Sequence, residues 1–215
     1  MGLVAALFRL SAWKGLRRIA LEQPNSQLLT DLPKGRSDPK EPQGKQIPYG
    51  HSEYNAVMHF LIEEAHNLDE NLFGNWINSL SEDIIYTIPV RQTVSRDDGR
   101  GFYPSMNWIY DDLGSISFKL KRNMESDSAF AEDPPTRTRR TVSNMRLFET
   151  ANPSEFLAQS SVLLRRNRGD TAVSEEISAR RDDIIRSTED GMKLARRTVW
   201  LDHSVLGMSN FAVFI

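Results

Sequence analysis

The chain has 215 residues, of which 39% are apolar and 26% are charged, the composition of a folded domain rather than of a disordered chain. It contains no cysteine, so it cannot itself supply disulfides, zinc thiolates or the cysteine ligands of an iron–sulfur cluster. Its net charge of -2 gives no bulk attraction to nucleic acid, and no apolar run approaches the roughly 20 residues that span a bilayer. We therefore expect neither a nucleic-acid nor a membrane partner.

Residues 1–50 are expected to be an N-terminal extension and linker, weakly ordered or peripheral, ahead of a single domain at residues 51–215. Four bases precede the first acid and lie among apolar side chains: Arg9, Lys14, Arg17 and Arg18. The first twenty residues therefore fit either an amphipathic surface helix or a loose leader. Prolines and glycines between residues 22 and 50 break any regular pattern.

Helical periodicity is clear after Ser52, which is expected to cap the first turn of a helix. The apolar stripe of this helix is Tyr54, Val57, Met58, Leu61, Ile62 and Ala65. The same period predicts a second helix from Leu68 to near Ser81. A third, shorter helix is predicted between Asp111 and Arg122.

Strand patterns begin at residues 83–95, where β-branched and aromatic residues dominate and Gly99 and Gly101 mark the following turn. Four further strands are predicted, at about residues 138–149, 155–167, 174–188 and 192–201. Turn residues at 169–170 and 190–191 indicate hairpins. Because helices come first and an antiparallel meander follows, the pattern predicts an α+β fold rather than alternating βαβ units.

Charge is divided unevenly along the chain. Nine acids face two bases between residues 51 and 99, whereas thirteen bases face nine acids between residues 137 and 200. An acidic helical part and a basic sheet suit oriented assembly with a partner. Scattered, solvated charge is the simpler alternative.

One helical stripe offers candidate metal ligands. His59, Glu63 and His66 fall on one line of the first helix, with Asp69 nearby, and these residue types can hold iron or zinc. On a helical wheel the line lies about 130° from the centre of the apolar face. It therefore points toward solvent or a partner, and we expect no metal site there.

Acid–base chemistry is a second possibility, since helices packed on a curled sheet leave a cone that can hold a ligand. Its mouth could be lined by His51, Asp83, Tyr86, Tyr110 or Asp111. No spacing among them is specific to a catalytic group, and Tyr86 is expected to be a half-buried residue of the sheet.

Basic clusters raise nucleic-acid binding as a third possibility. They are Arg137-Thr138-Arg139-Arg140, Arg165-Arg166-Asn167-Arg168, Arg180-Arg181 and Arg196-Arg197. Neighbouring residues of a strand point to opposite faces, so these arginines do not form one stripe. Arginine–carboxylate bridges within or between subunits are the better interpretation. The residues alone indicate no self-sufficient active site.

Several short segments match the sequence motifs of a known protein family, in the same order along the chain. The longest is residues 131–144, AEDPPTRTRRTVSN; the others are His51-x-Glu53-Tyr54, Glu64-Ala65-x-x-Leu68-Asp69, Glu82-Asp83-Ile84-x-Tyr86-x-x-Pro89-x-Arg91 and Ser178-x-Arg180-Arg181-Asp182. Together, from about residue 51 to 201, they closely resemble the small (β) subunit of aromatic-ring-hydroxylating dioxygenases. Arg140-Thr141 replaces the His-aromatic pair expected of that family, and the tail at residues 206–215 lies outside the resemblance.

The resemblance implies a cone-shaped α+β fold of the cystatin-like type, similar to scytalone dehydratase and ketosteroid isomerase. In it, a curled mixed or antiparallel sheet is backed by about three helices. It also implies a structural, cytoplasmic subunit with no catalytic, cofactor-binding or metal residues of its own. The partner large (α) subunit would carry a Rieske 2Fe–2S cluster and mononuclear Fe(II), in an assembly of three large plus three small subunits. Electrons would come from NADH through a reductase, often by way of a ferredoxin, and an arene would be converted with O2 to a cis-dihydrodiol.

Under this resemblance we expect a set of arginines to help form the subunit contacts: Arg137, Arg139, Arg165, Arg166 and Arg180. The alternative is a free-standing dehydratase or isomerase of the same fold, or a small-ligand-binding protein. Such a protein would act without a metalloprotein partner.

Overall fold

The fold is built on one curled β-sheet. The computed structural model describes residues 38–125, 135–208, 210 and 212–215. In chain order the elements are β1 (Gln46–Ile47), α3 (Ser52–Asp69), α4 (Phe73–Asn78), β2 (Leu80–Arg91), the 3-10 turn η1 (Arg96–Asp98), β3 (Phe102–Asp111), α5 (Leu113–Glu125), β4 (Arg137–Glu149), β5 (Glu155–Asn167), β6 (Glu175–Thr188) and β7 (Gly191–Leu201). Within the described residues the strands form a single seven-stranded sheet in the order β1-β4-β5-β6-β7-β2-β3.

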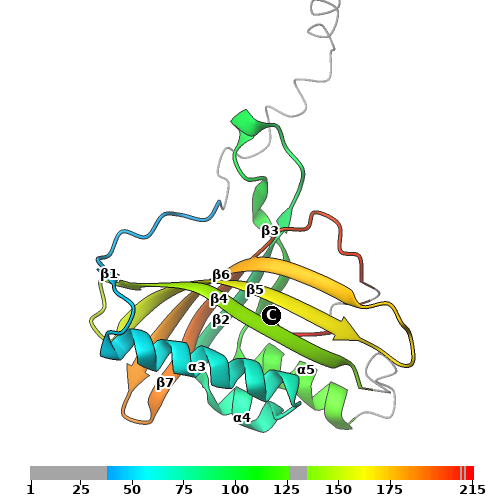
Figure 1. The fold of residues 1–215 in the computed structure, drawn as a ribbon, viewed down its shortest axis with the longest axis horizontal. Helices are drawn as coiled ribbons and strands as arrows, with labels where there is room; N and C mark the ends of the chain where they lie inside the picture. Colours follow the sequence, from blue (N-terminus) through cyan, green and yellow to red (C-terminus); the bar gives the residue numbers. More distant parts are fainter. Residues whose placement is uncertain (1–37, 126–134, 209, 211) are drawn as a thin grey trace, which may run out of the picture. The chain divides into compact units, whose positions relative to one another are not determined.

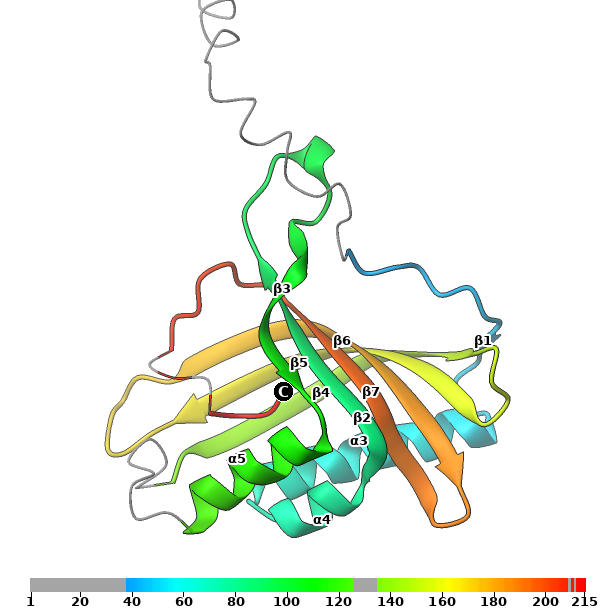
Figure 2. The same ribbon diagram turned by 180° about the vertical axis from the view of Figure 1, so that it is seen from behind.

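Long antiparallel pairs make up most of this sheet. Strands β4 to β7 follow one another as a meander, β2 joins β7 in parallel, and β3 pairs with β2 antiparallel. The helices α3, α4 and α5 lie on one side of the sheet, which curls around them (Figure 1 and Figure 2). The predicted α+β class, with a curled mixed sheet of the cone type backed by helices, is therefore confirmed.

Helix α3 forms where the apolar period predicts it, but two residues of its predicted buried and exposed faces are exchanged. Val57, Leu61 and Leu68 are each at most 2% exposed and face the sheet. Ile62 was expected on the same face but is 52% exposed. Glu64, which falls at helical spacing from Leu61 and Leu68, takes a buried position instead. The inner stripe of α3 therefore carries a carboxylate.

Two helix boundaries differ from the prediction. The predicted cap at Ser52 is wrong, because His51 is the Ncap residue and makes no side-chain capping hydrogen bond. The predicted second helix is also too long, since only the six residues of α4 are helical before β2 starts at Leu80. Asn71 has a φ of 57°, a left-handed conformation that cannot continue a helix and that asparagine tolerates better than most residues.

Strand β3 is absent from the predicted elements. It lies at the edge of the sheet, and the side chains of Met106, Trp108 and Tyr110 are 53%, 50% and 65% exposed. Its pairing with β2 shifts register on both sides of Pro89. Because apolar side chains point outward here, the strand lacks the alternation of a half-buried element.

The last four strands agree with the prediction to within one residue at their starts. Their hairpins close at Gly169 and Gly191, whose φ values of 58° and 108° lie in the region that favours glycine. Turn chemistry and strand periodicity indicate the same boundaries here, which explains the agreement.

The segment before residue 51 contributes a short strand, β1, to the edge of the sheet. Ile47 pairs with Leu147 of β4 and is buried. A Cβ on Gly44 would lie 1.8 Å from the carbonyl oxygen of Glu149, so only glycine lets the two backbones approach this closely. The first twenty residues, for which the sequence leaves open an amphipathic surface helix or a loose leader, lie outside the described residues. Among the residues that are described, no helix combines the length and the apolarity that a membrane crossing requires.

The final residues of the sequence return to the inside of the curled sheet. Val213, Phe214 and Ile215 are all buried, at 8%, 7% and 0% exposure. The Phe214 ring packs against Trp76 of α4 and Tyr86 of β2, with ring centroids 4.5 Å and 5.9 Å apart. This segment, residues 212–215, is called the tail below, and it completes the core between the helices and the sheet.

Candidate functional site

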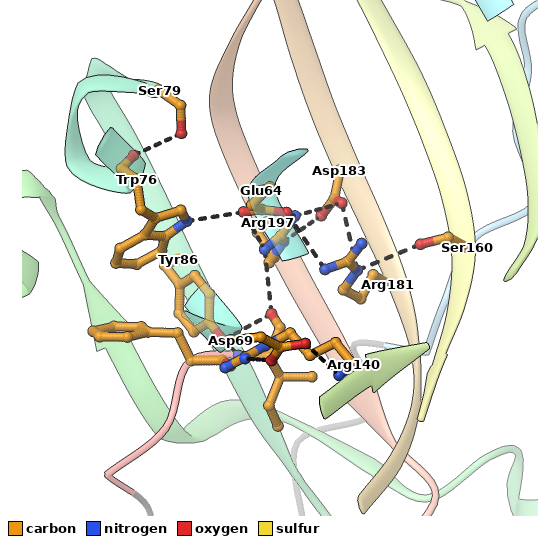
Figure 3. A network of polar contacts seen from close by, with 12 residues as sticks. Glu64, Asp69, Trp76, Ser79, Tyr86, Arg140, Ser160, Arg181, Asp183 and Arg197 are labelled. Carbon is orange, nitrogen blue, oxygen red and sulfur yellow. Dashed lines mark hydrogen bonds and ion pairs between the residues drawn. The ribbon is translucent and has the colours of Figure 1, made fainter. Parts of the chain in front are cut away.

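The inside of the sheet holds a cluster of buried charges around Glu64 of α3 (Figure 3). Arg197 of β7 donates two hydrogen bonds of 2.7 Å, one to each carboxylate oxygen of Glu64. The indole Nε1 of Trp76 donates a third, at 3.0 Å. A carboxylate on an apolar helix face requires such partners, because burying it alone would be very costly.

The sheet register brings the second carboxylate to the same arginine. Asp183 of β6 lies directly opposite Arg197 in the antiparallel ladder. Arg197 Nε and Nη2 donate to its two oxygens at 2.7 Å and 2.8 Å. Arg181 lies two residues from Asp183 on the same face of β6, with its Nη1 3.5 Å from Glu64. Glu64, Asp183, Arg181 and Arg197 together are called the interior ion cluster below.

The two arginines of the interior ion cluster are not equivalent. Burial opposes the charge of Arg197, yet Asp183 and Glu64 raise its pKa well above the ordinary value. Burial and the neighbouring Arg197 charge lower the pKa of Arg181 instead. The Nη2 of Arg181 has no hydrogen-bond partner among the described residues. Arg197 is thus the hub of the cluster, and Arg181 is a weaker, secondary partner.

The Glu64 carboxylate of the cluster is held in its charged form. Burial alone would raise the pKa of Glu64, but the charges of Arg197 and Arg181 and the hydrogen bonds from Arg197 and Trp76 keep it below its ordinary value. The cluster pairs two carboxylates with two guanidinium groups, so its formal charges balance. A carboxylate with a lowered pKa is a poor general acid or base at neutral pH. These contacts therefore suit a structural role.

A second buried pair joins the end of α3 to β4. The Arg140 side chain forms an ion pair with Asp69, and both side chains are at most 3% exposed. Asp69 also accepts hydrogen bonds from the Arg140 backbone N–H at 2.8 Å and from Thr138 Oγ1 at 3.0 Å. Burial lowers the pKa of Arg140, and the Asp69 charge opposes this. The pair fixes one end of the helix to the sheet.

The predicted division of paired arginines between two faces is confirmed. Arg140, Arg166, Arg181 and Arg197 are buried, whereas their neighbours in the sequence point outward or are half-exposed. The sequence shows the arginine pairs, but it does not show which carboxylates the inward members bind. The available signal was Glu64 itself, a charged residue at a stripe position of the first helix.

The five arginines predicted for subunit contacts are placed differently from one another. The side chains of Arg139 and Arg165 are 68% and 61% exposed and pair with Glu70 and Glu176. Arg137 is exposed and donates to the Gly169 carbonyl oxygen at 2.7 Å.

The other two are less accessible. Arg180 is 24% exposed and pairs with Asp182 at 2.9 Å. The side chain of Arg166 is only 1% exposed, donates to Glu175 at 2.5 Å and also contacts the Asn210 side chain at 3.0 Å. Because it is enclosed by its own chain, Arg166 offers no surface contact.

The predicted acid–base candidates do not form one group. Tyr86 and Asp111 are register partners on β2 and β3, yet Tyr86 is bonded to the tail and Asp111 to Lys119. His51 lies beside Glu53 on the surface. Asp83 is bonded to Arg186, whose hydrogen bonds lower the pKa of Asp83 to about 2.

The remaining two expectations concern Tyr86 and the candidate metal stripe. Tyr86 is fully buried rather than half-buried, and burial raises its pKa to about 12. His59, Glu63 and His66 are exposed, as the helical wheel predicts. Among the described residues, no three or more His, Cys, Asp or Glu side chains come together in a group that could hold a metal ion.

These features define a curled α+β sheet whose interior is filled by ion pairs and by the chain's own tail. The family described as "Ring hydroxylating beta subunit" matches residues 63–208. The chain therefore belongs to the β subunits of ring-hydroxylating dioxygenases, as the sequence motifs predict.

Solved structures share the same fold. A chain of naphthalene 1,2-dioxygenase with indole bound in the active site is similar over 78% of this chain and 89% of its own, at 20% identity and a TM-score of 0.67. The β subunit of benzoate 1,2-dioxygenase from Burkholderia mallei is similar over 73% and 93%, at 18% identity and a TM-score of 0.55. A putative scytalone dehydratase from Novosphingobium aromaticivorans is similar over 70% and 85%, at 13% identity and a TM-score of 0.51. At these identities the similarity shows the fold alone.

Proposed function

We propose that this chain is the structural small subunit of a multicomponent aromatic-ring dioxygenase and supports assembly of iron-containing large subunits. The complete reaction would convert an arene, O2 and NADH to a cis-dihydrodiol in the cytoplasm, as part of aromatic hydrocarbon catabolism. The observation that carries the proposal is the filled interior: the inward polar groups bind one another and the tail, in a chain of the β-subunit family.

The donor set of this chain does not fit the metal groups of the reaction. A Rieske 2Fe–2S cluster needs two cysteines and two histidines, and the sequence has no cysteine. Mononuclear iron of this type is held by two histidines and a carboxylate, and the described residues bring no such group together. The proposal therefore assigns both metal groups to the large subunit, and the supply of electrons to a reductase, with or without a ferredoxin.

The exposed arginines support a protein partner. Arg139 and Arg165 are opposite each other on β4 and β5, so two like charges stand side by side at the surface. Their carboxylate partners in this chain are solvent-exposed, and such pairs contribute only about 0–1 kcal/mol to stability. A carboxylate of a large subunit could replace them at little cost to the fold. We retain Arg137, Arg139 and Arg165 as the principal contact residues of an assembly of three large plus three small subunits, and Arg180, which is 24% exposed, as a further candidate.

Exposed apolar side chains on β3 also suit a protein contact. Met106, Trp108 and Tyr110 are each at least half exposed at the sheet edge. Clustered exposed apolar residues mark interaction surfaces more often than isolated ones do. Within the proposed complex, a large subunit would cover them.

Charge reversal tests the assembly role. With large and small subunits co-expressed, Arg137→Glu or Arg139→Glu should reduce the hexamer peak on size-exclusion chromatography. Circular dichroism of the small subunit should not change, because both side chains are at the surface. Arg122→Glu, at an exposed position of α5, is the matched control and should leave the hexamer intact. A hexamer that persists in both variants would exclude these arginines as contact residues.

The alternative is a free-standing dehydratase, isomerase or ligand-binding protein of the same fold. It predicts turnover by the purified chain without any metalloprotein. The proposed role predicts no turnover by the chain alone, and Rieske absorbance in a purified sample only when a large subunit is co-expressed and co-purifies. Turnover of a hydroxylated aromatic substrate by the chain alone would favour the alternative.

A further inference from the structure

The two edges of the sheet differ in length. The edge strands are β1 and β3. Strand β1 is only two residues long, and such a short edge offers few free backbone groups to another chain. Strand β3 is ten residues long, and no other strand of the described sheet pairs with its outer side (Figure 2). The sheet therefore has one short edge and one long edge that is open to a further strand.

The open edge carries no charge. Edge strands that remain unpaired commonly carry lysine or other charged side chains, which keep a second strand from adding to them. The residues from Phe102 to Tyr110 include no Asp, Glu, Lys, Arg or His. In the same segment, Met106, Trp108 and Tyr110 are each at least half exposed. This edge therefore lacks the charges that discourage strand addition.

A proline in β2 determines the direction of the backbone at Asn107. Pro89 is the register partner of Asn107 in the antiparallel pair of β2 and β3. Opposed residues of an antiparallel pair either exchange two N–H···O bonds or point these groups away from each other. Pro89 has no N–H, so this pair cannot be of the first kind. The N–H and C=O groups of Asn107 therefore point away from β2, toward the open edge.

The backbone at Asn107 is accessible from outside. Asn107 is exposed, as are Ser105, Met106 and Trp108 beside it. Among the described residues, none of the backbone hydrogen bonds of loops and turns reaches Asn107. A further strand can therefore reach the outward N–H and C=O groups without displacing a contact of the fold.

We propose that the large subunit covers this edge by strand addition, with an extended segment of the large subunit paired to residues 105–110 of β3. The inference rests on the proposed function and names how one of its contacts is made. The paired region is about 20 Å long at about 3.4 Å per residue. Main-chain hydrogen bonds, those of Asn107 among them, supply the affinity. The added segment is uncharged where it faces Met106, Trp108 and Tyr110, because a charge buried there without a partner would be costly.

Symmetry favours the large subunit over a second copy of this chain. Two copies that join β3 to β3 form a two-fold contact, in which each strand covers the other. Three small subunits cannot all be paired in this way within an assembly of three large plus three small subunits. One large subunit for each small subunit covers every β3 edge.

Two substitutions at Asn107 separate the backbone from the side chain. Asn107→Pro removes the outward N–H, whereas Asn107→Ala keeps this N–H and removes the amide side chain. The complex with a co-expressed large subunit is diluted, and its dissociation constant is measured by mass photometry. Asn107→Pro should raise this constant at least about fivefold, the effect of losing one hydrogen bond, and Asn107→Ala should match the unmodified chain. The urea midpoint of the free small subunit should be the same in all three proteins, because the lost N–H makes no bond within the fold.

Hydrogen exchange of the unmodified protein gives a test that also serves if Asn107→Pro does not fold. The Asn107 amide should exchange at least about tenfold more slowly in the complex than in the free small subunit, because the added strand must open before exchange can occur. Mass spectrometry with fragmentation of the peptide that contains residues 105–110 resolves this amide.

Three results would overturn strand addition and leave the assembly role intact. One is a complex of equal affinity with Asn107→Pro and with Asn107→Ala, and another is equal exchange at Asn107 in the complex and in the free chain. The third is a free small subunit that forms a dimer, which Asn107→Pro converts to a monomer without weakening the complex; the edge would then belong to a second copy. If no large subunit co-purifies with the unmodified chain, the proposed function itself is refuted, and strand addition with it.

Discussion

Replacing Arg197 with methionine tests whether the interior ion cluster holds α3 to the sheet. The guanidinium makes hydrogen bonds of 2.7–2.8 Å to Glu64 and Asp183, and its side chain is fully buried. Methionine retains much of the volume but leaves two buried carboxylates with Arg181 as their remaining cationic partner. Removing one partner of a buried ion pair costs about 3–5 kcal/mol. We expect the free energy of unfolding at pH 7 to fall by about 4 kcal/mol.

Urea denaturation of the purified chain measures this loss. With an m-value of about 2 kcal/mol/M, the unfolding midpoint should fall by about 2 M. Arg196→Met is the matched control, because Arg196 precedes Arg197 on the same strand and is exposed. Surface substitutions usually stay within about 0.5 kcal/mol. Equal losses in the two variants would refute the reasoning from burial.

The pH dependence of the Arg197→Met variant gives an independent check. In the native chain the pKa of Glu64 is below its ordinary 4.5, so its stabilising contribution is complete above that value and is lost as the pH falls through the lower, folded pKa. In the variant, burial is opposed by one arginine fewer, and we expect the folded pKa of Glu64 to rise above 4.5. The folded variant then takes up a proton more readily than the unfolded chain does. Its deficit relative to the native chain should shrink between pH 7 and pH 5, and a constant deficit would contradict this account.

Two further predictions concern the surface and the strand β1. Asp83→Asn should cost less than about 1 kcal/mol at pH 7, because this carboxylate is 63% exposed. Its folded pKa of about 2 lies below the ordinary 3.8, so the cost should shrink as the pH falls below about 4 and most of it should be gone near pH 2; a cost in guanidinium titrations that is as large at pH 2 as at pH 7 would contradict the ion pair with Arg186. Gly44→Ala should accelerate amide hydrogen exchange at Glu149, because the new Cβ would collide with that residue's carbonyl oxygen. Gly74→Ala, where nothing lies within 4 Å of the new Cβ, should leave exchange at Glu149 unchanged, and equal rates in the two variants would show that the collision is relieved without opening the strand.

Much of the architecture could be predicted because local signals agree with one another. In β4 to β7, strand periodicity and hairpin glycines specify the same boundaries, and the structure follows them closely. Strand β3 could not be predicted in this way. Its exposed side chains, Trp108 and Tyr110 among them, reverse the usual relation between apolarity and burial. Strand β3 forms because it pairs with β2, and the alternation of apolar and polar residues in its own sequence does not indicate it.

The interior could be predicted only in part. The division of Arg196 and Arg197 between two faces follows from strand geometry alone. The choice of Glu64 and Asp183 as internal partners depends on the register between a helix and a sheet, which no single segment encodes. The burial of Tyr86 has the same origin, because Ile215, its hydrogen-bond partner, lies 129 positions away in the sequence.

The uneven division of charge along the sequence has an internal explanation as well as an external one. Acids of the helical part and bases of the sheet meet inside the fold, as Glu64 with Arg197 and Asp69 with Arg140. These pairs span the interface between the two layers, so they fix how the helix lies on the sheet. Only the charge that remains outside is available to a partner.

In each arginine pair, we therefore expect the inward arginine to stabilise the fold and the outward arginine to be available for a partner. At Arg140, Arg181 and Arg197 the inward member contacts a helix or the tail, and its loss should reduce stability whether or not a large subunit is present. The outward member makes only exposed or half-buried contacts, so under the proposed function its loss should reduce assembly alone. Arg139 and Arg140 make the sharpest comparison, because they are consecutive on β4 and pair with consecutive acids of the sequence, Glu70 and Asp69. If Arg139→Met lowered the unfolding free energy as much as Arg140→Met, the outward positions would belong to the fold, and their assignment to subunit contacts would lose its physical basis.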